Sequence, residues 1–430
     1  MKHVIRSFVL FFFSTMILVS ATFPVEELIT RPPGAFYESV AMDSQGVLFL
    51  NERQTHTIFR VRPYGMIEDW AHAPEGGGFA GLAIDAQDRV FTTGITGEGI
   101  QAIFTFAADG TRRVLAEIPD AHFLNGATFL PNGTLLVVDS KIGATEETET
   151  GEIYAVDPES GEVSVFFQDR LLGKTKAENL AYPAANGIKY FEQRLFLTNS
   201  ERAQVTSLAL TEDLQPLELS VVANEIVGDD FAVAQDGSLY ITTHPVNTLV
   251  HLSADGEVNT IAGMTEGMTG ATAAVFGRRL GDESNLYVVT NGGSYIPPES
   301  GIETAKVLRV AVPQRGYKSF AGPMKTQPSW QLFMVTADTV AEKAHLRAEA
   351  GPRYARYLEA HFLKIMIAGQ VLDSVGGEPS TRLYLIEAPD ADTAVAFLED
   401  SPYGEVGMYV NISARPFRSM IGRWMQGVAW

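Results

Sequence analysis

The segment GEIYAVDPESG, residues 151–161, decides the fold, because versions of it recur through the first three hundred residues of the chain. Each version is an alternating run of apolar and polar residues, and most versions end in a turn rich in Asp and Gly. Alternation with a period of two is typical of half-buried β-strands, and such turn residues are typical of hairpins. We identify six copies, the last of them shortened, at residues 56–65, 101–110, 151–161, 203–213, 247–256 and 305–313.

A second alternating unit lies between successive copies, for example at residues 129–139 and 232–242. Each period of about 40 to 60 residues therefore holds four short strands, which is typical of a propeller blade. The last copy lacks its fourth strand, and residues 25–29 match the missing piece. We predict an all-β, six-bladed propeller over residues 22–313, closed into a ring by this N-terminal strand.

One position in several blades carries an oxygen donor. Counting back eight residues from the turn glycine reaches Glu38, Asn125 and Asp229, and the shorter fourth blade places Asn186 there. In a propeller this position begins the innermost strand, so the four side chains should meet at one mouth of the central channel. Two carboxylates and two amides form an all-oxygen set that suits Ca²⁺ first, with Mg²⁺ or Mn²⁺ as alternatives. The competing interpretation is that these are turn residues that satisfy backbone groups.

The composition narrows the classes of function. The chain has 430 residues, with 52 acidic residues against 32 basic ones and a formal net charge of -20. The negative electrostatic potential of such a chain repels phosphate backbones and anionic lipids, so we expect no nucleic-acid partner. The chain has no cysteine, which excludes disulfides, thiolate catalysis and cysteine-ligated metal centres.

The N-terminus predicts the compartment. Lys2 and Arg6 precede an apolar run at residues 7–19, and small residues follow at positions that a signal peptidase reads. We expect residues 1–21 to be a cleaved signal peptide and the product to be secreted or periplasmic. A retained anchor is the alternative, although the run is shorter than the roughly 20 residues that span a bilayer. No other stretch is long and apolar enough, so no membrane span is expected after cleavage.

Four short motifs carry a family resemblance. They are FYES at 36–39, LNG at 124–126, ANGI at 185–188 and GDDF at 228–231. Through them, residues 23–313 resemble the senescence-marker-protein/gluconolactonase/regucalcin-like family of six-bladed propellers. The resemblance implies a divalent metal at the top of the channel and, in many members, hydrolysis of lactones.

The resemblance also implies roles for single residues. Glu38, Asn186 and Asp229 match the metal ligands, Asn125 matches the residue that contacts metal or substrate, and Asp229 matches the general base. Asp230 is the next carboxylate along the chain, and we group it with Asn125 and Phe123 as substrate-binding residues. Members that act on sugar lactones often carry an arginine two residues before the channel asparagine, where this chain has Phe123. A more apolar lactone or ester is therefore expected as the small-molecule substrate.

The composition changes after residue 313. Residues 314–329 are polar, contain Gly and Pro, and predict a linker. Residues 330–430 then predict the order β-α-β-β-α-β of an α+β, ferredoxin-like domain, with helix extending from residue 339 to residue 369.

This C-terminal segment resembles the YciI-related domain through RYLEAH at 356–361, LIEAPD at 385–390 and SPYGEVGMY at 401–409. The resemblance implies a dimeric α/β barrel with a His and an Asp as its acid/base pair. Tyr354 and Ser401 occupy those two positions here, so the pair is absent. We therefore expect a dimerisation or small-ligand module, and a homodimer formed through it.

Three functions remain open at this point. The leading hypothesis is an exported, metal-dependent hydrolase that opens a lactone or related ester at the top of the channel. The second is a non-catalytic, metal-containing propeller that binds a small ligand. The third is a carbon-bond-forming enzyme similar to strictosidine synthase, a family that commonly has disulfides, which this chain cannot form.

Overall fold

The structure is a computed structural model. It describes residues 23–62, 67–144, 150–175, 182–279, 281–318, 331–343, 345–361, 365–372, 379–417, 421–422 and 427–428. The expected signal peptide, and most of the expected linker, lie outside the described residues. Within the described part, no helix combines the length and the apolar character needed to cross a bilayer.

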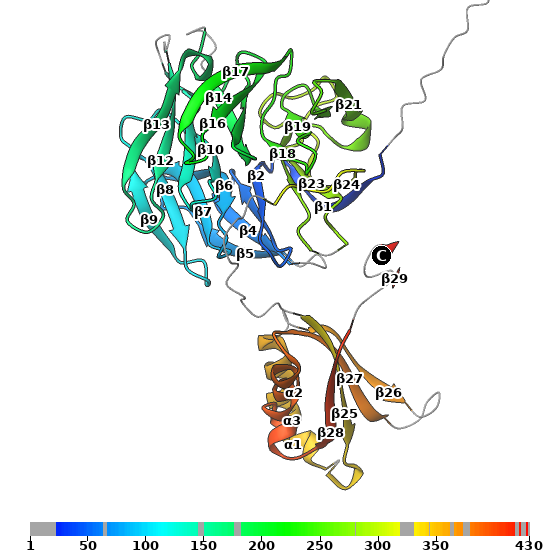
Figure 1. Ribbon diagram of the computed structural model, residues 1–430. Coiled ribbons are helices and arrows are strands. Elements are labelled where there is room, and N and C mark those ends of the chain that lie inside the picture. The colour runs from blue at the N-terminus through cyan, green and yellow to red at the C-terminus, as the bar shows by residue number, and fades with distance from the viewer. Residues whose placement is uncertain are drawn as a thin grey trace, which may run out of the picture.

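Residues 25–311 form six antiparallel sheets of four strands each, as Figure 1 shows from blue to yellow. The first two sheets contain β2 (Tyr37–Met42), β3 (Leu48–Glu52), β4 (Thr57–Val61) and β5 (Ile67–His72), then β6 (Gly78–Ile84), β7 (Val90–Ile95), β8 (Gln101–Phe106) and β9 (Arg112–Glu117). The next two contain β10 (Leu124–Phe129), β11 (Leu135–Asp139), β12 (Gly151–Val156) and β13 (Val163–Asp169), then β14 (Ala185–Phe191), β15 (Arg194–Asn199), β16 (Gln204–Leu210) and β17 (Pro216–Asn224). The last two contain β18 (Phe231–Val233), β19 (Leu239–Thr243), β20 (Thr248–Leu252) and β21 (Val258–Ala262), then β22 (Ala271–Phe276), β23 (Asn285–Thr290), β24 (Thr304–Ala311) and β1 (Val25–Pro33).

The six sheets are the blades of a β-propeller. The first strand of each blade contacts the first strand of the next, in the order β2, β6, β10, β14, β18, β22 and back to β2. The N-terminal strand β1 pairs antiparallel with β24 and completes the sixth blade, with Val25 opposite Val310 and Ile29 opposite Val307. The predicted propeller and its closure by residues 25–29 are confirmed at the level of strand pairing.

Side-chain hydrogen bonds cross every boundary between blades. In each case a buried hydroxyl or amide of one blade donates to a backbone carbonyl on the inner strand of the next, or just before that strand. The donors and acceptors are Asn51 to Ala80 at 2.6 Å, Thr93 to Asn125 at 2.9 Å, Ser140 to Ala185 at 2.5 Å, Thr198 to Asp229 at 2.5 Å, Thr242 to Thr272 at 2.9 Å, and Thr272 to Tyr37 at 2.7 Å. These bonds connect each blade to a backbone carbonyl at the inner strand of the next, and they hold the inner strands at fixed heights around the channel.

Glycines on the inner strands allow this close approach. A Cβ atom on Gly126 would lie 2.2 Å from the Asn186 carbonyl oxygen, and one on Gly187 would lie 2.6 Å from the Asp230 carboxylate. Gly126 and Gly187 lie within β10 and β14. The interpretation of these Asn-Gly pairs as turns is therefore wrong, because the glycines serve packing between strands.

The hydrophobic core lies between adjacent blades. One cluster joins the sixth and first blades through Ile29, Tyr37, Leu50 and Val307, all of them buried. Similar clusters fill the other boundaries. Three short 3-10 helices accompany the strands, at η1 (Arg170–Leu172), η2 (Met264–Glu266) and η3 (Ala341–Lys343).

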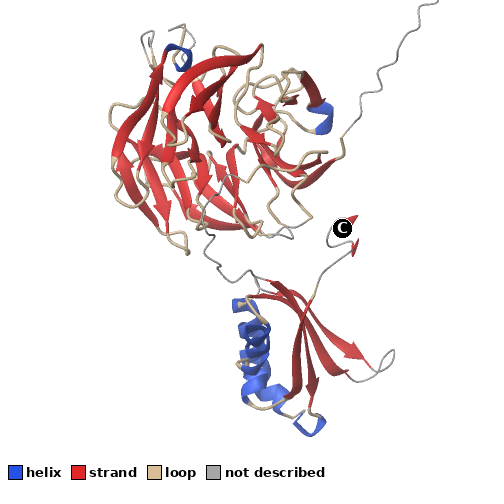
Figure 2. Ribbon diagram, in the orientation of Figure 1, coloured by secondary structure: helices blue, strands red, loops and turns tan. Residues whose placement is uncertain are grey.

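The C-terminal residues form a sheet of their own, covered on one side by helices (Figure 2). Its elements are β25 (Gln331–Thr339), α1 (Leu346–Ala360), β26 (Ile365–Leu372), β27 (Pro379–Ala388), α2 (Ala391–Glu399), α3 (Pro402–Glu405) and β28 (Tyr409–Pro416), followed by the short pair β29 (Ile421–Gly422) and β30 (Gly427–Val428). The strands are antiparallel in the order β26-β27-β25-β28. The helix expected up to residue 369 is wrong, because residues 365–372 pair with β27 as a strand, where isoleucines suit the pleated surface.

We predict that the ring depends on its closing strand. Ile29→Ala removes a buried side chain between the sixth and first blades, where Ile29 is 8% exposed. The free energy of unfolding should fall by about 2–4 kcal/mol in urea denaturation. Leu217→Ala on an outer strand, where Leu217 is 58% exposed, should change it by no more than about 0.5 kcal/mol. Equal effects of the two substitutions would argue against closure by β1.

Candidate functional site

The four oxygen donors predicted from the blade alignment lie around one pocket, which we call the upper site. Glu38, Asn125, Asn186 and Asp229 line it together with Asp230, and it encloses about 280 Å³, part of which is open to solvent. Glu38, Asn125 and Asn186 sit at the first or second residue of their inner strands. Asp229 instead precedes β18 by two residues, because that strand is short.

The two amides and Asp229 form one chain of hydrogen bonds. Asn125 donates from Nδ2 to Asn186 Oδ1 at 2.7 Å, and Asn186 donates from Nδ2 to Asp229 Oδ1 at 2.8 Å. The Asn186 amide also donates to the Ser200 hydroxyl at 3.0 Å. Both asparagine side chains are therefore held in place before any ligand arrives.

Asp229 is the most electrostatically perturbed group of the upper site. Burial raises the pKa of its carboxyl well above its usual range, and the neighbouring charges of Glu38 and Asp230 raise it further. The hydrogen bond from Asn186 and the charge of Arg53 act in the opposite direction. A carboxylate with a raised pKa is a stronger base than an exposed one. A cation that binds beside it stabilises its ionised form.

Arg53 is a residue that the sequence reasoning missed. Its Nη1 atom lies 3.7 Å from Glu38 Oε1, and its guanidinium lies 5.5 Å from the ring centres of both Phe36 and Phe123. Arg53 follows β3 in the first blade, and the pairing of β3 with β2 returns it to Glu38 at the mouth, at a position that the blade alignment of oxygen donors does not mark. Arg53 of the first blade thus places a positive charge beside Phe123 of the third.

His244 also belongs to this mouth. Its Nδ1 atom lies 3.8 Å from Asp229 Oδ2, and its Nε2 atom lies 3.2 Å from Asn291 Nδ2. The Gly293 amide donates to Asn291 Oδ1 at 2.8 Å, so the Nδ2 group of Asn291 is the donor to His244. Burial lowers the pKa of His244 to about 4, so the ring is neutral near pH 7 and carries its proton on Nδ1, facing Asp229.

The predicted residue Asp230, and His122 just before the third blade, have different surroundings. Asp230 accepts from Lys189 Nζ at 2.5 Å and from the Phe231 amide at 2.8 Å, so it lines the pocket as part of an ion pair. His122 is 41% exposed, and its Nδ1 atom lies 3.7 Å from Asp139 rather than near the upper site.

At the two positions where the YciI resemblance implies an acid/base pair, Tyr354 and Ser401 make hydrogen bonds within the domain. The Tyr354 hydroxyl is buried and hydrogen-bonds to the hydroxyls of Tyr384 and Tyr409. Ser401 Oγ donates to the Leu398 carbonyl at 2.7 Å and accepts from the Gly404 amide at 3.2 Å. Both side chains therefore hold the fold of this domain together.

The donor set of the upper site fits a hard divalent cation. Among the described residues, no three His, Asp or Glu side chains gather as a metal cluster, so the set relies on amides as well as carboxylates. Glu38 and Asp229 would supply charge, and Asn125 and Asn186 would supply amide oxygens, with the Asn186 amide turned so that Oδ1 in place of Nδ2 faces Asp229. Burial, and after it the charges of Glu38 and Asp230, raise the pKa of Asp229, and a cation bound beside this carboxylate would offset both effects.

Comparisons with known proteins agree on the fold. No family model matches the chain. A curated protein of Phoma sp, described as "Putative hetero-Diels-Alderase", is 24% identical over 195 residues, which cover 42% of this chain and 55% of that protein. The chain thus aligns with little more than half the length of this relative.

Solved propellers align over most of their own length. The luciferin-regenerating enzyme superposes with a TM-score of 0.52 at 14% identity, covering 68% of this chain and 97% of that one. A regucalcin from Agrobacterium tumefaciens, described as a calcium-binding protein, gives 0.52 at 16% identity, with 69% and 96% covered. A gluconolactonase from Xanthomonas campestris gives 0.50 at 16% identity, with 67% and 89% covered. The chain shares the propeller fold of the gluconolactonase and regucalcin structures.

We predict that the Asn186 amide cannot be replaced by a carboxylate of the same shape. Asn186→Asp places a third acid against Asp229, so the free energy of unfolding at pH 8 should fall by about 2–3 kcal/mol without added cation. The two buried carboxyls hold protons more tightly in the folded state than in the unfolded state, so stability should fall as pH rises and the loss should shrink toward pH 5.

The matched control is Asn132→Asp. Asn132 is exposed, and its Oδ1 atom accepts from the Thr134 amide at 3.1 Å, which Asp can also do. This variant should unfold with the same free energy as the parent at both pH values. An Asn186→Asp variant that is as stable as the control at pH 8 would contradict the electrostatic description of the site.

Proposed function

We propose that this protein is a metal-dependent hydrolase that opens a lactone or related ester in the upper site. The observation that carries the proposal is the buried Asp229 carboxylate with its raised pKa, held by Asn186 beside a second carboxylate, Glu38. The match of its fold to a gluconolactonase and a regucalcin supports the same class.

The reaction follows from the positions of these groups. A divalent cation held by Glu38, Asn186 and Asp229 would polarise the carbonyl of the substrate. Asp229 accepts a proton from water as the water oxygen bonds to the carbonyl carbon, and the ring C–O bond then breaks. The leaving alkoxide takes up the proton, so one water is consumed and a hydroxy acid forms. Neutral His244 lies 3.8 Å from Asp229, with its Nδ1 proton facing that carboxylate.

The mouth favours an apolar substrate. Phe36 and Phe123 flank the Arg53 guanidinium, and Tyr295 adds an exposed ring 6.0 Å from His244. Such a surface packs against an acyl chain or ring, while Arg53 offers donors to the substrate oxygens. We therefore propose apolar lactones or esters as the substrate class, with sugar lactones as poorer substrates.

A panel of lactones of increasing chain length tests the proposal, assayed with Ca²⁺, Mg²⁺, Mn²⁺ or chelator. We expect cation-dependent hydrolysis that Asp229→Asn reduces by at least about 100-fold, the usual contribution of a general base. Glu218→Gln, on an exposed outer strand, is the control and should retain full activity. Hydrolysis that survives both the chelator and Asp229→Asn would refute the mechanism.

A pericyclic reaction is a second candidate, favoured by the resemblance to the Phoma sp protein described as a hetero-Diels-Alderase. In such a cycloaddition, an oxygen-containing diene and an alkene form two σ bonds at the expense of two π bonds, and no water is consumed. The ring-lined mouth and the Arg53 donors would suit this reaction without any base. Catalysed cycloaddition that is unchanged in Asp229→Asn, with no hydrolysis of any lactone, would favour this candidate.

We also propose that the protein is exported and that it forms a homodimer. Export by a cleaved signal peptide at residues 1–21 rests on the sequence. The strand order of the C-terminal sheet supports a ferredoxin-like domain, and we propose that it mediates a homodimer. If cations stabilise the protein but neither reaction is catalysed, a non-catalytic binding protein becomes the better description.

A further inference from the structure

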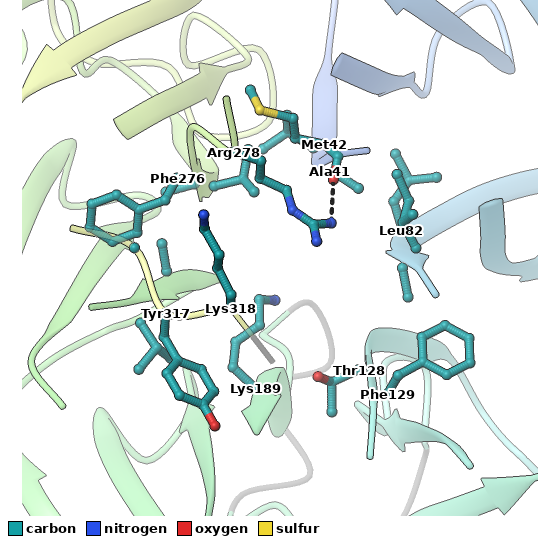
Figure 3. A pocket seen from close by; sticks show the side chains of 18 of the residues that line it. Ala41, Met42, Leu82, Thr128, Phe129, Lys189, Phe276, Arg278, Tyr317 and Lys318 are labelled. Carbon is teal, nitrogen blue, oxygen red and sulfur yellow. Dashed lines mark hydrogen bonds between the residues drawn. The ribbon is translucent and has the colours of Figure 1, made fainter. Parts of the chain in front are cut away.

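The central channel continues beyond the upper site into a second space, which we call the lower cavity. It is lined by the later residues of the inner strands and by residues 316–318, and it encloses about 890 Å³ including its open part. Leu82 and Ala127 line both spaces, so the two are neighbours along one channel. Figure 3 shows the lower cavity from close by.

The charge of the lower cavity is opposite to that of the chain. Among the described residues, the charged ones that line it are Lys189, Arg278 and Lys318, and none of the described lining residues is acidic. The whole chain carries a formal net charge of -20. In Figure 3 the three basic side chains border the same space, Lys189 from β14, Arg278 from the loop after β22, and Lys318 from the segment at 316–318. A concave surface of this kind concentrates anions that the rest of the molecule repels.

Arg278 is held at the wall of the cavity. It donates from Nη1 to the Met42 carbonyl oxygen at 3.2 Å, which fixes the plane of the guanidinium. Burial lowers the pKa of Arg278, and the nearby acids Asp88 and Asp43 only partly offset that effect. An anion in the cavity would therefore stabilise the charged guanidinium further.

The two lysines have acidic neighbours that do not line the cavity. Lys318 Nζ lies 3.8 Å from Glu283 Oε1, and its side chain is 51% exposed, so it can reorient toward a ligand at small cost. Lys189 Nζ lies 2.5 Å from Asp230, which faces the upper site. A ligand would thus meet one fixed donor, Arg278, and one adaptable donor, Lys318, with Lys189 adding positive potential.

The remainder of the lining is largely apolar. Met42, Leu82, Phe129, Phe276 and Tyr317 surround the basic groups in the same cavity (Figure 3). A fully hydrated inorganic anion would leave this surface unused, whereas an apolar body would bury it. A carboxylate also matches the planar fork of an arginine better than a single-point anion does.

We propose that the lower cavity is a second ligand site, which binds an organic carboxylate with an apolar body. Arg278 and Lys318 bind the carboxylate, and the apolar lining packs against the rest of the ligand. This site goes beyond the proposed function and does not depend on it, because it shares no charged residue with the upper site.

Calorimetric titration of the full mature protein with 2-naphthoate tests the proposal, with 2-naphthamide as the neutral probe of the same shape. We expect one saturable site for 2-naphthoate and affinity at least about tenfold lower for 2-naphthamide, which is the effect of one charge-assisted hydrogen bond. Lys318→Gln should weaken 2-naphthoate binding by about tenfold, and Arg278→Gln by more. Added salt should weaken binding in the parent protein.

Two controls keep the outcome decisive. Lys306→Gln removes a lysine that pairs with Glu27 at the edge of the sixth blade, and it should bind 2-naphthoate like the parent. Asp229→Asn alters only the upper site, so it should also leave the affinity within about twofold. Equal affinities for the two probes, unchanged binding in folded Lys318→Gln, or loss of binding in Asp229→Asn would each overturn the proposal, and none of these results depends on hydrolysis.

Discussion

The molecule depends on a ring of hydrogen bonds that crosses every boundary between blades. Each buried donor, such as Thr93 or Thr198, reaches a carbonyl on or just before the inner strand of the next blade. Two of these carbonyls belong to Asn125 and Asp229, so the bonds that close the ring also fix the backbone of the upper site. Strand pairing within a blade cannot do this, because it leaves neighbouring blades free to slide. Stability and site geometry therefore have one common origin.

The same constraint explains the unusual charge arrangement of the channel. Six closely packed inner strands leave room only for glycine, small side chains and a few polar groups. Water has little access to these polar groups. Glu38, Asp229 and Asp230 meet there on one side, and Arg278 lies toward the other. The Lys189–Asp230 ion pair lies between the two spaces and separates acidic surroundings from basic ones. The fixed positions of the blades keep the acids of the upper site and Arg278 of the lower cavity apart.

Much of the fold could be predicted because the signal is repeated. A strand pattern copied six times predicts blades, and the shortened last copy predicts closure by residues 25–29. The upper site could be predicted for the same reason, since Glu38, Asn125, Asn186 and Asp229 share one blade position. Arg53 and His244 could not be predicted in this way. They belong to the same blades as Glu38 and Asp229, but each lies in the loop after the second strand of its blade, which no aligned oxygen-donor position marks. Residues 365–369 were misassigned to a helix because short apolar runs do not distinguish buried helix from strand.

The central claim is that the inner strands hold Glu38, Asn186 and Asp229 as one cation site. The most direct measurement is anomalous X-ray diffraction from crystals of the mature protein soaked in Mn²⁺, recorded at the manganese edge. The account predicts an anomalous peak within coordination distance of the Glu38 and Asp229 carboxylates, lost in crystals of Asp229→Asn. A map with no peak at the upper site, or a peak that persists unchanged in Asp229→Asn, would contradict it.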